Sequence, residues 1–142
     1  MMQRLLSPLV LTLAATAAQA QVFFFPRERV DIPVNAISAT TFEVVRSGFA
    51  SPANMWCAAG TYAERALGYT GDRIWVKSGL APSAAGRSMV FSIEPVRPES
   101  TSYSYRLSTD GETKSMAAAL GACDPLEEQV FIRTSQGTIR AW

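Results

Sequence analysis

The chain has 142 residues, of which 48% are apolar and 18% charged, with 13 basic and 12 acidic side chains and no histidine. This composition is typical of one globular domain and not of a disordered chain. The near balance of charge argues against nucleic-acid binding, which needs a clustered basic surface. Without histidine the chain cannot build a Ser-His-Asp triad, a Cys-His dyad or a histidine-ligated zinc site.

The first twenty residues have the three parts of a secretory signal peptide. Residues 1–4 carry one positive charge, residues 5–17 are an apolar run, and Ala18-Gln19-Ala20 offers small residues where a signal peptidase cleaves. The apolar run is shorter than the roughly 20 residues that a membrane-spanning helix needs. We therefore expect cleavage after Ala20 and a soluble, formally neutral product in the periplasm or outside the cell, with no membrane span.

Residues 21–39, which contain two prolines, are expected to form an extended N-terminal arm that precedes the domain at 40–142. Three consecutive phenylalanines in the arm, Phe23, Phe24 and Phe25, would be costly to leave in water. Docking on the domain is the simpler interpretation, and self-association through these three side chains is the alternative.

The clearest helix is predicted over 52–67. Ser51 is a good N-cap, Pro52 suits the first helical position, and Gly68 favours a stop. Apolar and small residues recur at helical spacing and predict one buried stripe, formed by Met55, Ala59, Tyr62, Ala63, Ala66 and Leu67.

Alternating apolar and polar residues predict strands at Thr40–Arg46, Arg73–Lys77, Ser88–Pro95, 102–108 and Val130–Arg133. Residues 79–87 are expected to form a loop, and a short helix is expected over 116–121, capped by Thr113 or Ser115. This order predicts an α+β domain: a mainly antiparallel sheet of four to five strands, one main helix packed on a face and a short second helix.

Cys57 and Cys123 are the two cysteines of the chain. In an oxidising compartment such a pair is most simply one disulfide, which here would close a loop of about 65 residues and stabilise the fold by about 4 kcal/mol. The alternatives are a redox pair, which usually has C-x-x-C spacing, and a metal site, which needs more ligands. We favour the structural disulfide.

Catalytic candidates are few. Acidic pairs occur at Glu94 and Glu99, at Asp110 and Glu112, and at Glu127 and Glu128, but acids in turns are nearly always solvated. Ser78 with Lys77, or Ser115 with Lys114, are strand neighbours that point to opposite faces. No catalytic residue, cofactor or metal is assigned, and the sequence leans against an enzyme without deciding the question.

Aromatic residues are further candidates for a binding surface: Trp56, Trp75, Tyr103, Tyr105 and Trp142. The alternation places Trp75 beside Arg73 and Lys77 on the polar face of its strand. An exposed tryptophan between cations suits stacking on a sugar or peptide, or a protein contact. The equal alternative is that the helix covers this face and Trp75 is part of the core.

The string Trp56–Gly60 reads W-C-A-A-G. Together with the leader, the strand at Arg73–Lys77 and a late single cysteine, it resembles a group of small exported alphaproteobacterial proteins with no assigned activity. The resemblance spans residues 40–124. It implies a periplasmic location, supports pairing of Cys57 with Cys123, and transfers no catalytic residue.

These observations predict a non-catalytic exported module that binds an unknown protein or envelope component. The first alternative is an enzyme of unfamiliar type that uses carboxylate or serine chemistry without histidine. The second is a structural accessory protein that only self-associates through Phe23–Phe25.

Overall fold

The computed structural model describes residues 20–123, 131–134 and 137–140. The predicted signal peptide lies outside the described residues except for Ala20. The acidic pair Glu127 and Glu128 and the aromatic residue Trp142 also lie outside them.

The described residues form eight strands and two helices, so the predicted α+β class is confirmed, with more strands than expected. In chain order they are β1 (Gln21–Phe25), β2 (Val30–Ala36), β3 (Thr41–Arg46), α1 (Pro52–Arg65), β4 (Arg73–Ser83), β5 (Gly86–Ser92), β6 (Thr113–Ser115), α2 (Met116–Gly121), β7 (Phe131–Thr134) and β8 (Gly137–Arg140).

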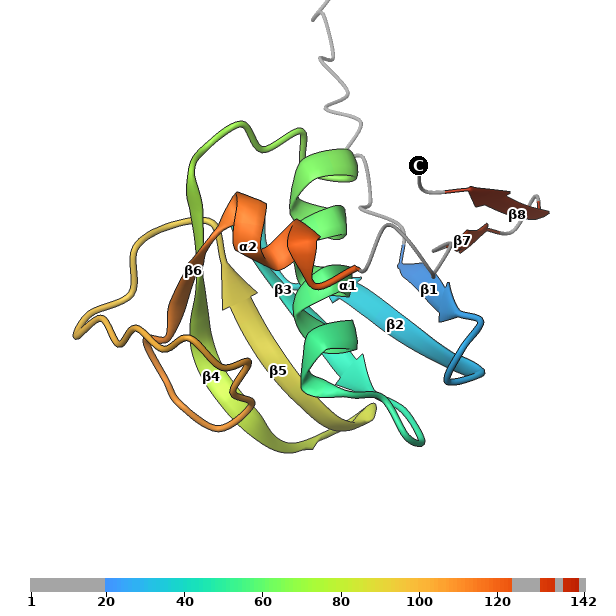
Figure 1. The fold of residues 1–142 in the computed structure, drawn as a ribbon, viewed down its shortest axis with the longest axis horizontal. Coiled ribbons are helices and arrows are strands. Elements are labelled where there is room, and N and C mark those ends of the chain that lie inside the picture. The colour runs from blue at the N-terminus through green and yellow to red at the C-terminus, as the bar shows by residue number, and fades with distance from the viewer. Residues whose placement is uncertain (1–19, 124–130, 135–136, 141–142) are drawn as a thin grey trace, which may run out of the picture.

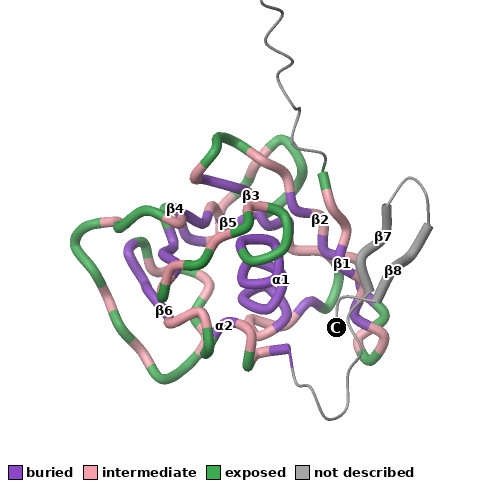
Figure 2. Tube along the Cα trace, turned by 90° about the horizontal axis from the view of Figure 1, so that it is seen from above, coloured by how far each residue is buried: buried purple, intermediate pink, exposed green. Residues whose placement is uncertain are grey.

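One antiparallel sheet contains all of these strands, in the order β6-β4-β5-β3-β2-β1-β7-β8. Short connections join β1 to β2, β2 to β3 and β4 to β5, whereas α1 connects β3 to β4 across one face of the sheet (Figure 1). The sheet curls around this helix, and Figure 2 shows α1 as the buried centre of the molecule. The core therefore lies between the inner face of the sheet and the helices.

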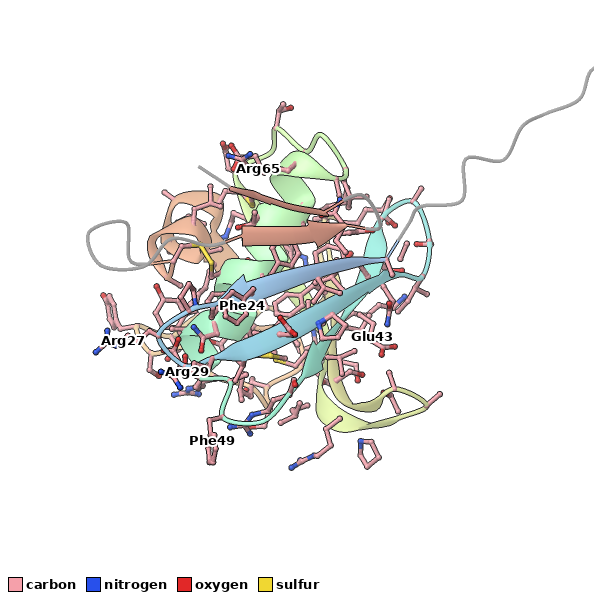
Figure 3. The ribbon with its side chains drawn as sticks, turned by 90° about the vertical axis from the view of Figure 1, so that its right-hand side faces the viewer. Phe24, Arg27, Arg29, Glu43, Phe49 and Arg65 are labelled. Atoms are coloured by element: carbon pink, nitrogen blue, oxygen red, sulfur yellow. A yellow bond between two sulfur atoms is a disulfide. The ribbon has the colours of Figure 1, made fainter. Side chains whose placement is uncertain are left out.

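The segment predicted as an N-terminal arm is part of the sheet. Phe23 and Phe25 are fully buried on the inner face, where they pair in register with Ile32 and Val30. Phe24 lies on the other face of β1, away from α1 (Figure 3). Docking of the phenylalanines is confirmed for the two that alternation directs inward.

Strand β4 is longer than predicted, and the expected loop at 79–87 is wrong. β4 continues to Ser83 and turns directly into β5, with register shifts between Val76 and Ser78 and between Ser78 and Ala81. The small residues and Pro82 in this half of the strand show no apolar–polar alternation, so the pattern did not predict a strand there. The strand forms through backbone pairing with β5, and the bulges accommodate the irregular register.

The strand predicted over 102–108 is wrong, because this segment is a loop. Its backbone carbonyls bond to separate elements: that of Arg106 accepts the indole N–H of Trp56 at 3.0 Å, and that of Leu107 accepts the N–H of Leu80. Because this segment bonds to a helix on one side and to a strand on the other, it does not pair along its length with a neighbouring strand. Its alternation of tyrosine and serine therefore does not correspond to a strand.

At the C-terminal end, β7 confirms the strand predicted at Val130–Arg133. The following strand, β8, pairs antiparallel with β7 and was not among the predicted strands.

Helix α1 begins as predicted but is buried more completely. Ser51 and Asn54 form a reciprocal capping box, with bonds of 3.1 and 2.9 Å. Every residue from Asn54 to Ala63 is buried, so the single predicted stripe is too narrow. A helix that is buried on all sides must pack against other segments in addition to one sheet. Burial also raises the pKa of the Tyr62 phenol above its usual value.

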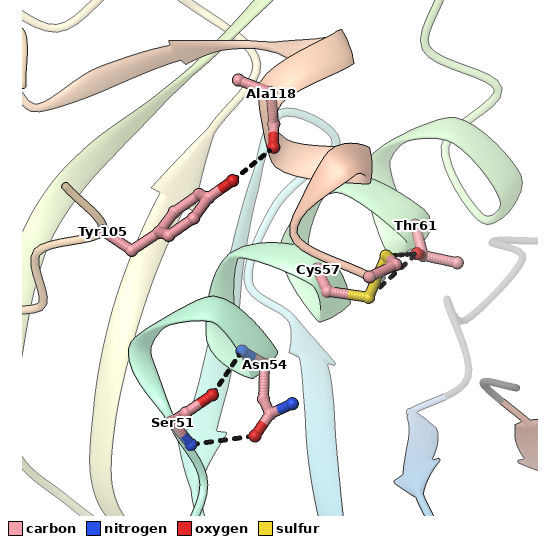
Figure 4. Close-up of a disulfide and its surroundings, with 7 residues drawn as sticks. Ser51, Asn54, Cys57, Thr61, Tyr105 and Ala118 are labelled. Carbon is pink, nitrogen blue, oxygen red and sulfur yellow. Dashed lines mark hydrogen bonds between the residues drawn. A yellow bond between two sulfur atoms is a disulfide. The ribbon is translucent and has the colours of Figure 1, made fainter. Parts of the chain in front are cut away.

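The predicted disulfide joins Cys57 of α1 to Cys123, just after α2, with the two Cα atoms 4.9 Å apart (Figure 4). The hydroxyl of Thr61 lies 4.0 Å from one sulfur and 3.8 Å from the other. A Cβ placed on Gly60 would lie 3.0 Å from the Ala119 Cβ, so the two helices meet at close range. The small residues of the W-C-A-A-G string allow this approach.

Replacing both cysteines, Cys57→Ala with Cys123→Ala, is expected to lower the free energy of unfolding by up to about 4 kcal/mol, because the 66-residue separation is no longer closed in the unfolded chain. Urea denaturation of the oxidised protein and the double variant measures the difference. The oxidised protein should also be lighter than its reduced form by two hydrogen atoms. Two free thiols in the protein purified without reductant contradict the prediction.

Candidate binding site at the β6 edge

A pocket of about 260 Å³ opens beside β6, the strand at one edge of the sheet. We call it the Arg73 pocket. It is lined by residues of β4, the loop before β6, β6 itself and α2: Arg73, Thr101, Ser102, Tyr103, Tyr105, Thr113, Lys114, Ser115 and Ala118. Two cations, two phenols and four hydroxyls line it, and no carboxylate does.

The guanidinium of Arg73 is held in place from within the sheet. Its Nε donates to the Thr113 hydroxyl at 3.1 Å, and this hydroxyl donates to the Ile74 carbonyl at 2.9 Å. The ladder that pairs Arg73 with Ser115 fixes the backbone on both sides. No carboxylate of the described residues lies within ion-pair distance of Arg73. The arginine is therefore oriented but not neutralised.

Two tyrosines form the outer wall of the pocket. The Tyr105 hydroxyl donates to the Ala118 carbonyl at 3.0 Å and ties the loop to α2 (Figure 4). The Tyr103 side chain is fully exposed to solvent at 110%. One ring thus belongs to the framework, and the other is free to contact a ligand.

A buried ion pair lies beneath the pocket. The Lys114 ammonium is 3.4 Å from Glu112 Oε1, with side-chain exposures of 5% and 0%. The ammonium also donates to the carbonyls of Ser102 and Ser104 at 2.9 Å each. The carboxylate of Glu112 receives no hydrogen bond from the described residues. Lys114 is therefore the residue that compensates the buried charge of Glu112.

The same ammonium lies over two aromatic rings, 5.3 Å from the centroid of Trp56 and 5.0 Å from that of Tyr105. Such cation–π contacts are stronger when they are shielded from water. Lys114 thereby connects the central helix, the loop of the pocket and the edge strand.

The trio predicted for binding, Arg73, Trp75 and Lys77, does not form one surface. Trp75 is only 7% exposed, and its indole N–H donates to Glu99 Oε1 at 3.0 Å. Glu99 is also paired with Arg97 at 2.9 Å, so the loop after β5 covers Trp75, whereas α1 lies on the opposite face. Lys77 is exposed and does not line the Arg73 pocket. Arg73 alone of the three lines it.

In two of the predicted pairs, Asp110 with Glu112 and Ser115 with Lys114, the two side chains have different partners. Asp110 accepts the Gly79 N–H at 2.6 Å, whereas Glu112 is fully buried, so the expectation that it is solvated is wrong. Ser115 accepts the Ala118 N–H at 3.0 Å as the cap of α2, while the Lys114 ammonium lies among backbone carbonyls.

Sequence reasoning missed the pairing of Glu112 with Lys114. A spacing of two in a strand places both on one face, and that signal was present. Their burial depends on the loop that covers them, and this loop was predicted as a strand.

Comparison with known proteins found no relative. No family model matches the chain, and neither a curated protein nor a solved structure does. Among residues 20–123, 131–134 and 137–140, no helix is long and apolar enough to cross a membrane, and no group of three candidate metal ligands occurs.

Lys114→Met is expected to destabilise the protein by about 3–5 kcal/mol, because it leaves the Glu112 carboxylate buried without a compensating charge. Adding Glu112→Leu removes that charge, so the double variant should be more stable than the single one. Urea denaturation of the unaltered protein, the two single variants and the double variant measures the energetic coupling between the two side chains. A double variant whose loss equals the sum of the two single losses would contradict this account of the pair.

Proposed function

We propose that this protein is an exported, non-catalytic binding module that holds a carboxylate group of a protein or envelope component in the Arg73 pocket. The observation that carries the proposal is the Arg73 guanidinium, which is oriented by Thr113 at 3.1 Å in a pocket without a lining carboxylate. A planar guanidinium with unused N–H groups matches a carboxylate in geometry and charge.

The pocket is large enough to accommodate one unit of a larger ligand. About 260 Å³ is slightly below the range of roughly 300–1,000 Å³ that is typical of small-molecule pockets. One uronic acid or one C-terminal residue of a peptide is of suitable size, and both present a carboxylate. The exposed ring of Tyr103 offers a stacking surface for the next sugar or side chain.

The proposed location is the periplasm or the exterior of the cell. The signal-peptide pattern of residues 1–20 favours export. An intramolecular disulfide is compatible with an oxidising compartment. The resemblance to small exported alphaproteobacterial proteins supports the periplasm in particular.

A binding role is favoured over catalysis by the chemistry of the lining residues. No acid lines the pocket, and the Ser115 hydroxyl has no base beside it because Lys114 bonds to Ser102 and Ser104. An enzyme with carboxylate or serine chemistry stays the alternative. It predicts turnover of a ligand, which the binding module does not.

The test is a titration of the isotope-labelled mature protein, in which the NMR signals of its backbone amides report binding. The probes are glucuronate against glucose, and acetyl-dialanine against its amide. We expect carboxylate-dependent shifts in the loop 101–105 and β6, and at least about ten-fold weaker binding by Arg73→Gln, because it loses a charged hydrogen-bond donor. Whichever carboxylate binds more tightly distinguishes a sugar from a peptide ligand.

Arg65→Gln is the matched control, because Arg65 is exposed at the end of α1 and does not line the pocket. Lys77→Gln tests the strand face predicted from alternation. Equal binding of neutral and acidic probes, or equal losses in the Arg73 and Arg65 variants, would refute the proposal. Hydrolysis of a probe would favour the enzyme.

A further inference from the structure

One end of the sheet, made of residues that do not line the Arg73 pocket, presents an exposed phenylalanine near arginines. We call this surface the Phe49 tip, formed by Arg29, Arg46, Phe49 and Arg87. Phe49 is 90% exposed, which is unusual for a large apolar side chain. In Figure 3 it projects from the lower end of the molecule, with Arg29 beside that end and Arg65 at the opposite end.

Three separate chain segments build the tip. A Cβ placed on Gly48 would lie 3.6 Å from Val30 Cγ1, so the loop after β3 lies against the start of β2, next to Arg29. Arg46 Nε donates to the Ala50 carbonyl at 3.2 Å, which holds this guanidinium at the base of the Phe49 loop.

Arg87 joins the cluster through the sheet register. It is the direct partner of Arg46 in the β3–β5 ladder. Like charges at directly opposite positions repel and destabilise a sheet, unless an anion lies between or above them. Among the described residues, no carboxylate lies within ion-pair distance of Arg29, Arg46 or Arg87. The Oε2 atom of Glu28, the acid adjacent to Arg29, is buried and away from solvent.

We propose that the Phe49 tip docks the protein on an anionic phospholipid surface. The arginines match the lipid phosphates in charge and hydrogen-bonding geometry, and the phenylalanine enters the boundary between headgroups and acyl chains. The formal net charge of the whole chain is only +1, but this does not oppose the proposal. Salt screens each charge beyond about 10 Å, so the charges of the local cluster determine the attraction.

A bilayer fits the shape of the tip better than a protein partner does. Protein interfaces of standard size bury about 800 Å² per partner, with their apolar anchors near the centre of the contact. Here one apolar side chain projects at an extremity, and the three arginines lie on the chain segments that build the same tip. A single projecting apolar side chain matches a bilayer, because a bilayer deforms around it. The proposal does not depend on the Arg73 pocket.

The test is sedimentation of the mature protein with vesicles of phosphatidylglycerol and phosphatidylethanolamine, compared with vesicles of phosphatidylcholine alone. Binding is expected only to the anionic vesicles and should weaken as salt increases. Phe49→Ser should weaken it about ten-fold. Each of Arg46→Gln and Arg87→Gln should weaken it about five-fold.

Ile37→Ser and Arg65→Gln are the matched controls, since both side chains are exposed and lie away from the tip. Both should bind like the unaltered protein, and circular dichroism checks that every variant is folded. Binding that does not distinguish the two vesicle types, or that falls equally in the controls, would overturn the proposal. Binding to polyglutamate with no binding to anionic vesicles would also overturn it, in favour of an acidic protein partner.

Discussion

The close contact between α1 and α2 is the constraint on which the rest of the structure depends. At Gly60 even a Cβ would lie 3.0 Å from the Ala119 Cβ, and the Cys57–Cys123 disulfide closes the same interface covalently. Because α2 follows β6 without a break, this contact also determines where the edge strand lies. The Arg73 pocket is built on that strand, so the W-C-A-A-G string helps to position the pocket without lining it.

Burial of α1 from Asn54 to Ala63 explains why the loop before β6 packs against the helix although it has no regular secondary structure. The inner face of the sheet covers one side of the helix, and α2 and this loop cover the remainder. Trp56 donates its indole N–H to Arg106, and its ring lies under the Lys114 ammonium. The polar side chains that hold the loop therefore complete the core and shape the wall of the pocket.

Local signals in the sequence predicted much of this fold. The capping residues at Ser51, the alternation of β3 and the lone cysteine pair each depend on near neighbours or on elimination, and each was confirmed. The second half of β4 was missed because pairing with β5 forms it in spite of its loop-like residues. The exposure of Trp75 was left open because it depends on Glu99, which lies 24 residues away.

The candidate sites were harder to predict than the elements. Arg73 was singled out for its neighbours in the strand, yet its position at a pocket follows from pairing with β6 and from a loop predicted as a strand. The Phe49 tip combines residues 29, 46, 49 and 87, which only the sheet register brings together. Sequence periodicity describes one element at a time, whereas both surfaces arise between elements.

Hydrogen–deuterium exchange tests most directly whether the α1–α2 contact positions the pocket. The oxidised mature protein is compared with the variant that lacks both cysteines, under conditions where both are folded. Our account predicts faster exchange in the loop 100–112, β6 and α2, with little change in β2, β3 and β5, because only the former depend on the contact. Uniformly faster exchange over the whole sheet, or unchanged exchange in β6 and the loop, would contradict it.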